Sequence, residues 1–420
     1  MAPPLTTVAV RRGKPVLVGP AKPTPREVKT LSDLDDQEGM RFYSAGIHLY
    51  RGDPAKAGQD PAKVIRAAIA EALVYYYPLA GRLREEAGRK LVVDCNGQGV
   101  MFVEADADVT VDDFGDVQGP PFPCFEQFVF DLAPGEDERV IDRPLLYLQF
   151  EKAIGEMARG AAAPSVAPVW AREFFSARSP PRPTHVHLEY EPSAGGPDRL
   201  MAVPRSEMVR ERFFFGPKEI AALRKRAPPH LRASSSRFEL ITYGPDEEVR
   251  VSFIVNARGR SSIPVPPGYY GNAYAFSVAS STAEKLTGSP IGYALELVKK
   301  AKANVTYEYL QSVADLMVLR GRPLFTVART YIVSDISHAG FKDVDFGWGE
   351  AVYGGPAKGG EGPILGVANY YSRYKNDKGE EGTAVPVCLP LAAMERFRSE
   401  VQNLTKEPAF DPYEQHVDQF

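Results

Sequence analysis

The chain has 420 residues, of which 44% are hydrophobic and 25% charged, a composition typical of a globular protein and a length that favours two domains. Its net charge of -4 and pI near 6.0 argue against a broad surface for nucleic acid or a membrane, although a local basic pocket for one anionic ligand stays open. The three cysteines, Cys95, Cys124 and Cys388, form no CxxC pair, which favours a reducing compartment and buried thiols over a disulfide framework.

Two further features indicate a cytoplasmic protein. The N-terminal residues contain no apolar core of the kind found in a secretion signal. The longest apolar stretch, residues 67–81, is interrupted by Glu71 and Pro78 and is too short to span a membrane.

The first part of the chain mixes helix and strand patterns. Residues 61–78 predict a helix that begins at Pro61 and ends at Pro78. The Asn96-Gly97 pair predicts a hairpin between the short strands on either side. Residues 143–150 are expected to form a buried strand and residues 151–162 a helix.

The middle of the chain is rich in proline. Residues 164–205 contain eight prolines, which predicts a long surface crossover between two halves. We therefore divide the chain into an N-terminal domain (1–163), a crossover (164–215) and a C-terminal domain (216–420).

The last part again mixes both kinds of element, which favours an α/β fold with two domains of similar size. Helices are expected at 216–228, 289–304, 305–320 and 389–405, and strands at 248–260, 325–334 and 363–374. Neither a metal-binding spacing nor a GxGxxG or P-loop motif occurs, so no metal or cofactor is predicted.

Five motifs, in order along the chain, resemble the plant acyl-CoA-dependent acyltransferases called the BAHD family. They are "LSDLDDQ" (31–37), "YYPLAGRLRE" (76–85), "VNARGR" (255–260), "PPGYYGN" (266–272) and "DFGWG" (345–349). The resemblance extends from about residue 6 to about residue 401. It implies two chloramphenicol-acetyltransferase-like domains with mixed sheets, joined by a crossover loop, with a substrate channel between them.

The resemblance also implies a reaction. A histidine in a His-x-x-x-Asp motif takes a proton from an acceptor hydroxyl or amine, which then attacks the thioester of acyl-CoA, the co-substrate. Trp348 is the candidate donor to the oxyanion, while Gly347 and Gly349 permit a tight backbone around Phe346. Asp345 is expected to form a structural salt bridge, for which Arg258 is the candidate partner.

We expect Tyr270, Asn272 and His338 to line the channel of a monomer that binds no nucleic acid and no membrane. The branch that the sequence resembles transfers benzoyl or hydroxycinnamoyl groups to benzyl-type alcohols or arylalkyl amines. The sequence does not distinguish an alcohol from an amine, because both need the same base.

The His-x-x-x-Asp motif itself is absent. None of the six histidines is followed by aspartate four positions later. Both flanks of its expected place are intact and meet at residues 149–151, as if about 25–30 residues of strand, loop and helix start were missing. A second apparent junction lies at residues 241–243.

Other histidines offer weak substitutes. His185 and Glu189 have the right spacing, but the alternation in 185–189 predicts an exposed extended segment in the crossover. His338 is the histidine nearest in sequence to Asp345, in a stretch expected to be a surface loop. His48 is expected to end a strand rather than to touch substrate.

Three interpretations follow. In the first, this is an acyltransferase whose chain is impaired by the loss of its catalytic loop. In the second, it is a pseudoenzyme that binds acyl-CoA or a small aromatic ligand without turnover. In the third, it is an enzyme of the same fold that uses another base, with His338 as the candidate. Sequencing the cDNA across codons 149–151 and 241–243 would separate the first interpretation from the others.

Overall fold

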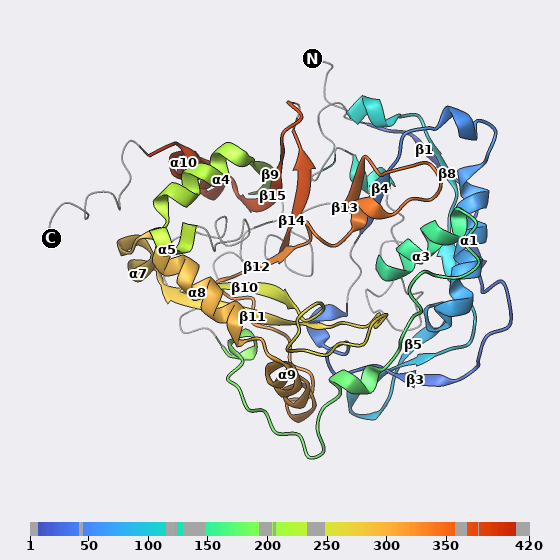
Figure 1. Cartoon of the computed structure of the whole chain (residues 1–420), viewed down its shortest axis with the longest axis horizontal. Coiled ribbons are helices and arrows are strands. Elements are labelled where there is room, and N and C mark those ends of the chain that lie inside the picture. The colour runs from blue at the N-terminus through green and yellow to red at the C-terminus, as the bar shows by residue number, and fades with distance from the viewer. Residues whose placement is uncertain are drawn as a thin grey trace.

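The structure is a computed structural model that describes residues 7–41, 45–114, 122, 124–128, 148–192, 204, 207–232, 248–357, 368–376 and 378–408. The second apparent junction, at 241–243, lies outside these residues. The elements form two groups that lie side by side, with α1 and α3 in one and the largest sheet in the other (Figure 1).

The C-terminal half is built on a mixed sheet of six strands in the order β11-β10-β12-β14-β15-β9. The β10–β12 and β12–β14 pairs are parallel and the other three are antiparallel. The strands are β9 (Met208–Phe215), β10 (Glu248–Asn256), β11 (Tyr274–Thr282), β12 (Thr330–Asp335), β14 (Ala368–Lys375) and β15 (Glu381–Pro390). Alternate residues of β10, such as Phe253 and Val255, enter the core, as the strand period of two requires.

Helices complete this core. Apolar residues of α4, α8, α9 and α10 pack with the sheet in one large cluster. The helices of this half are α4 (Pro217–Arg226), α5 (Pro229–Arg232), α7 (Ala283–Gly288), α8 (Ile291–Asn304), α9 (Tyr307–Leu319) and α10 (Leu391–Thr405). Helices α4, α8, α9 and α10 and strands β10, β12 and β14 overlap the ranges expected from the sequence, whereas α5, α7, β9, β11 and β15 have no counterpart among those expectations.

The N-terminal half has a second core, formed mainly by α1 (Pro61–Tyr75) and α3 (Leu148–Ala158). Asp60 caps α1 by accepting from the amide of Ala62 at 3.0 Å, and the helix ends three residues before Pro78. Small sheets surround it in the orders β1-β8, β2-β7 and β3-β6-β5. Their strands are β1 (Val10–Arg12), β2 (Val16–Val18), β3 (Val28–Thr30), β5 (Arg82–Glu85), β6 (Leu91–Asp94), β7 (Val100–Phe102) and β8 (Ala105–Ala107), and a short helix, α2 (Phe125–Phe128), follows.

The hairpin predicted at Asn96-Gly97 is wrong. A turn is present, with Gly97 at a φ of 70°, but β6 pairs with β3 and β5 whereas β7 pairs with β2. The turn residues predict a reversal of the chain, and the pairing partners come from earlier strands that the local pattern does not specify.

The strand predicted at 143–150 is also wrong at its end. Residues 148–150 form the first turn of α3, and Phe150 is fully buried against α1. The apparent junction at 149–151 therefore lies inside this helix, and residues 143–147 of the predicted strand lie outside the described residues.

The two halves exchange segments. Strand β13 (Tyr353–Pro356), from the C-terminal half, pairs antiparallel with β4 (Gly46–Leu49), from the N-terminal half. Tyr270, from the C-terminal half, packs in the N-terminal core. The predicted crossover range ends in β9, so the irregular part stops before Met208. No helix in the described part of the chain is long and apolar enough to cross a membrane.

Candidate active site

The "DFGWG" loop is organised by the carboxylate of its aspartate. Asp345 Oδ1 accepts from the amides of Gly347 at 2.7 Å and Gly349 at 2.9 Å. Both glycines have positive φ, 103° and 89°, which side-chain-bearing residues rarely adopt. The predicted tight backbone is therefore present, and it depends on these three residues.

Arg159, at the end of α3, is the partner of Asp345. Its guanidinium lies 3.6 Å from Asp345 Oδ2 and also donates to the Asp345 carbonyl. Gly155, one turn earlier, packs so closely that a Cβ there would lie 2.6 Å from the same carbonyl. Helix α3 thus holds the loop.

The predicted pairing of Asp345 with Arg258 is wrong. Arg258 is turned toward the "PPGYYGN" segment, where it donates to the carbonyls of Tyr269, at 3.1 Å, and Gly271. Burial lowers the pKa of its guanidinium. The motif that contains Arg258 is found as predicted, but the arginine holds a different loop.

Two predicted channel residues lie in this same segment. Tyr270 is buried, with its ring 5.2 Å from that of Tyr76 and 5.8 Å from that of Trp170, so it is a core residue rather than an exposed one. Asn272 is half-buried, and its backbone N–H donates to Asp35 Oδ1 at 2.7 Å.

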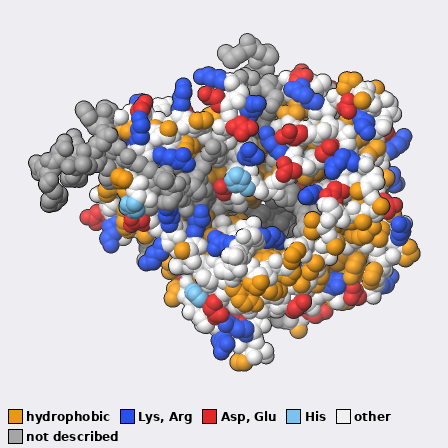
Figure 2. Space-filling model, viewed as in Figure 1, with side chains coloured by type: hydrophobic (Ala, Val, Ile, Leu, Met, Phe, Trp, Pro, Cys, Tyr) orange, Lys and Arg blue, Asp and Glu red, His pale blue; other side chains and the backbone are white. Residues whose placement is uncertain are grey.

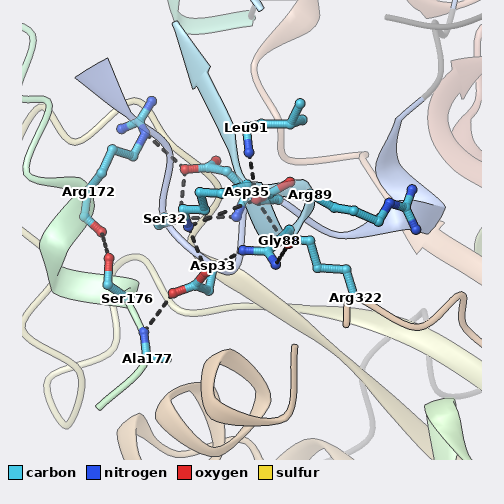
Figure 3. Close-up of polar contacts among 12 residues, drawn as sticks. Ser32, Asp33, Asp35, Gly88, Arg89, Leu91, Arg172, Ser176, Ala177 and Arg322 are labelled. Carbon is cyan, nitrogen blue, oxygen red and sulfur yellow. Dashed lines mark hydrogen bonds and ion pairs between the residues drawn. The ribbon is translucent and has the colours of Figure 1, made fainter. Parts of the chain in front are cut away.

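Asp35 belongs to a buried polar cluster that joins the "LSDLDDQ" turn to distant parts of the chain (Figure 3). Arg172, from the crossover, lies 2.9 Å from Asp35 Oδ2. Arg322, after α9, lies 3.1 Å from Asp33 and 2.6 Å from Asp36. Motifs that are far apart in sequence therefore meet in one network of opposite charges.

Trp348 is half-buried in the loop. Among the described residues, no histidine ring contacts its indole. His338, the predicted substitute base, is exposed in the turn after β12. The structure therefore does not bring Trp348 and His338 together.

His48 is instead the histidine beside the "DFGWG" loop. It lies in β4, as expected, and its ring is 6.3 Å from the Phe346 ring and 6.2 Å from the Phe341 ring. Its Nε2 lies 3.3 Å from Glu151 Oε2, in the first turn of α3. Sequence reasoning missed this pair because β4 and α3 are about a hundred residues apart.

The prediction of an exposed segment at 185–189 is wrong as well. His187 and Glu189 are buried, and His187 bridges Glu189 at 3.0 Å and Ser312 of α9 at 2.8 Å. Alternation in the sequence reflects a segment with one face against α9, so these groups fix the crossover in place.

The molecular face in Figure 2 is hollowed near its middle, and hydrophobic side chains gather below and to the right of the hollow. This shape agrees with the channel that the family resemblance implies between the two halves.

Comparison with known proteins identifies the family. The model of the Transferase family matches residues 8–152 and 147–404. The chain belongs to this family. The BAHD family predicted from the motifs is thereby confirmed, and the chain is an acyltransferase by descent.

Two similar relatives are benzyl alcohol O-benzoyltransferases from Petunia hybrida and Nicotiana tabacum, each 53% identical over 95% of this chain and 94% of the relative. Alcohol acyl transferase 1 (allele GSa) of Malus domestica is 49% identical over 97% of this chain and 96% of its own length. The alignments to the benzoyltransferases extend over 439 positions, more than the 420 residues of this chain, so these relatives carry residues that this chain lacks.

Solved structures confirm the fold. Vinorine synthase superposes with a TM-score of 0.65 at 19% identity, covering 94% of this chain and 98% of its own. The TRI101 protein of F. sporotrichioides, solved with coenzyme A and T-2, gives a TM-score of 0.55 at 15% identity over 90% of this chain and 98% of its own.

Proposed function

We propose that this protein transfers an aromatic acyl group, benzoyl or hydroxycinnamoyl, from acyl-CoA to an alcohol, and that this chain does so slowly. The 53% identity to benzyl alcohol O-benzoyltransferases over nearly the whole chain carries the proposal. In this reaction the acceptor oxygen attacks the thioester carbonyl, its proton passes to a base, and the C–S bond breaks.

The expected slowness comes from the missing base. A positioned general base contributes about 10²–10⁴ in rate, and the His-x-x-x-Asp motif does not occur in the chain. The two family matches overlap at residues 147–152, and the relatives have residues that this chain lacks, which supports a lost segment at that point.

A second candidate function is binding of acyl-CoA without turnover. It is favoured by the same absent motif together with a "DFGWG" loop in which Asp345 accepts from the amides of Gly347 and Gly349.

The test is product formation by the purified full chain with benzoyl-CoA and benzyl alcohol, measured by chromatography beside the Nicotiana tabacum relative. We expect benzyl benzoate to form about 10²–10⁴ times more slowly than with that relative. Benzoyl-CoA binding without any product would favour the second function, and neither binding nor product would contradict both.

A further inference from the structure

The first turn of α3 brings a carboxylate close to the "DFGWG" loop. Glu151 lies in the first turn of this helix, and its Oε2 meets His48 Nε2 at 3.3 Å. Among the described residues, Glu151 has no other hydrogen-bond or ion-pair partner, so its second oxygen is available.

Three observations place this carboxylate beside the "DFGWG" loop. His48, its partner, contacts the Phe346 ring. The Tyr50 ring is stacked 6.3 Å from the His48 ring and lies 5.6 Å from the Phe346 ring, and its hydroxyl donates to the Val344 carbonyl at 2.7 Å. The pKa of Tyr50 is raised by burial and further by the negative charges of Glu151 and Asp345.

The geometry also fixes which nitrogen of His48 carries hydrogen. A carboxylate only accepts, so Nε2–H donates to Glu151. Nδ1 is buried without a partner among the described residues, against Gly354, where a Cβ would lie 2.8 Å from it.

We propose that Glu151 is the general base for residual acyl transfer by this chain and that His48 is the positioning residue that holds it. This inference rests on the proposed function. The acceptor O–H donates to the free oxygen of Glu151, its oxygen bonds to the thioester carbon, and the proton moves to the carboxylate. When the C–S bond breaks, the proton passes to the CoA thiolate and leaves as the thiol.

The separation of 3.3 Å is longer than the 2.7–2.9 Å of most charge-assisted hydrogen bonds. The contact with His48 therefore holds Glu151 only weakly, and the second oxygen of the carboxylate can accept from the acceptor hydroxyl. A base in the open first turn of α3 is a weaker arrangement than a dedicated catalytic loop, which agrees with a slow reaction.

The test measures benzyl benzoate formation by the full chain and five variants. Glu151→Gln keeps an oxygen for His48 but removes the base, and should lower the rate about 100-fold or to background. His48→Ala should lower it similarly, whereas His48→Gln, whose amide can donate to Glu151, should restore most of it. Glu156→Gln, on the same helix, is the matched control and should keep the wild-type rate.

His338→Gln tests the competing base and should also leave the rate unchanged. Wild-type turnover that survives Glu151→Gln would overturn the inference while the proposed function stands. An absence of turnover in the wild-type chain would overturn both, and benzoyl-CoA binding measured by calorimetry would then separate the pseudoenzyme from a chain that does not bind the donor.

Discussion

Single buried groups in this protein have their hydrogen bonds determined by their neighbours. Ser312 Oγ accepts from the amides of Thr184 at 2.9 Å and His185 at 3.1 Å, which occupies both of its lone pairs. Its own hydrogen must then point to His187 Nε2 at 2.8 Å, which leaves Nδ1–H to donate to Glu189. Ser312, His187 and Glu189 are hydrogen-bonded in the same sequence as a catalytic triad. Because His187 and Glu189 are buried, the three residues hold the crossover against α9 instead.

A pH-dependent contribution is expected at Glu308, at the start of α9. Hydrogen bonds from Arg178 and then Thr184 hold the pKa of its carboxyl below the ordinary value of 4.5. A lowered folded-state pKa contributes stability that is present above the ordinary value and lost as the pH falls. The difference in unfolding free energy between wild type and Glu308→Gln should therefore be present at pH 7 and shrink from about pH 5 downward. Urea unfolding at several pH values measures it, and a difference that grows on acidification would contradict this account.

Among the elements, helix α3 connects the N-terminal core to the candidate site. It packs on α1, and it holds the "DFGWG" loop through Gly155 and Arg159. Its helical pattern is readable from the sequence. Its first turn was assigned to a strand because "RPLLYLQF" is continuously apolar, and such a run does not distinguish a buried strand from a buried helix start.

The replacement of Gly155 by alanine tests this contact. Alanine usually stabilises a helix relative to glycine, but here its Cβ would lie 2.6 Å from the Asp345 carbonyl. We expect a loss of about 1–3 kcal/mol in unfolding free energy, measured by urea denaturation. Gly288→Ala, in α7, is the control, because nothing lies within 4 Å of the added carbon. Equal effects of the two substitutions would show that the contact is not tight.

The sequence predicts the local features of the site but not the contacts between residues far apart in the chain. The turn geometry of Gly347 and Gly349 is predicted correctly, because positive φ is a local property. The partner of Asp345 is predicted wrongly, and the His48–Glu151 pair is missed altogether, because each joins residues more than a hundred positions apart. Such pairings depend on how α3, β4 and the loop pack together, which no local pattern encodes.

For the whole molecule, the buried network around Asp33, Asp35 and Asp36 joins the N-terminal half, the crossover and the C-terminal half (Figure 3). Arg172 is almost completely enclosed, and its guanidinium also lies 4.2 Å from the centre of the Trp170 ring. An enclosed ion pair of this kind is costly to break, because the remaining charge stays buried.

We therefore expect Asp35→Asn to lower the unfolding free energy by about 3–5 kcal/mol. The matched control is Asp112→Asn, which removes an ion pair with Arg51. The side chains of Arg51 and Asp112 are 54% and 73% exposed, so this substitution should lower the unfolding free energy by less than about 1 kcal/mol. Denaturant unfolding of both variants measures the difference. Similar losses in the two variants would contradict a structural role for the network.

The central claim is that this chain is a family acyltransferase whose base-bearing segment is missing at residues 149–151. The most direct test inserts, between Phe150 and Glu151, the segment that the Nicotiana tabacum benzoyltransferase carries at that place. A second insert, in which the histidine of the His-x-x-x-Asp motif expected for the family is alanine, serves as the control. We predict that the first insert raises benzyl benzoate formation about 10²–10⁴-fold and the second does not. A folded first insert that binds benzoyl-CoA and is no faster than the original chain would contradict the claim.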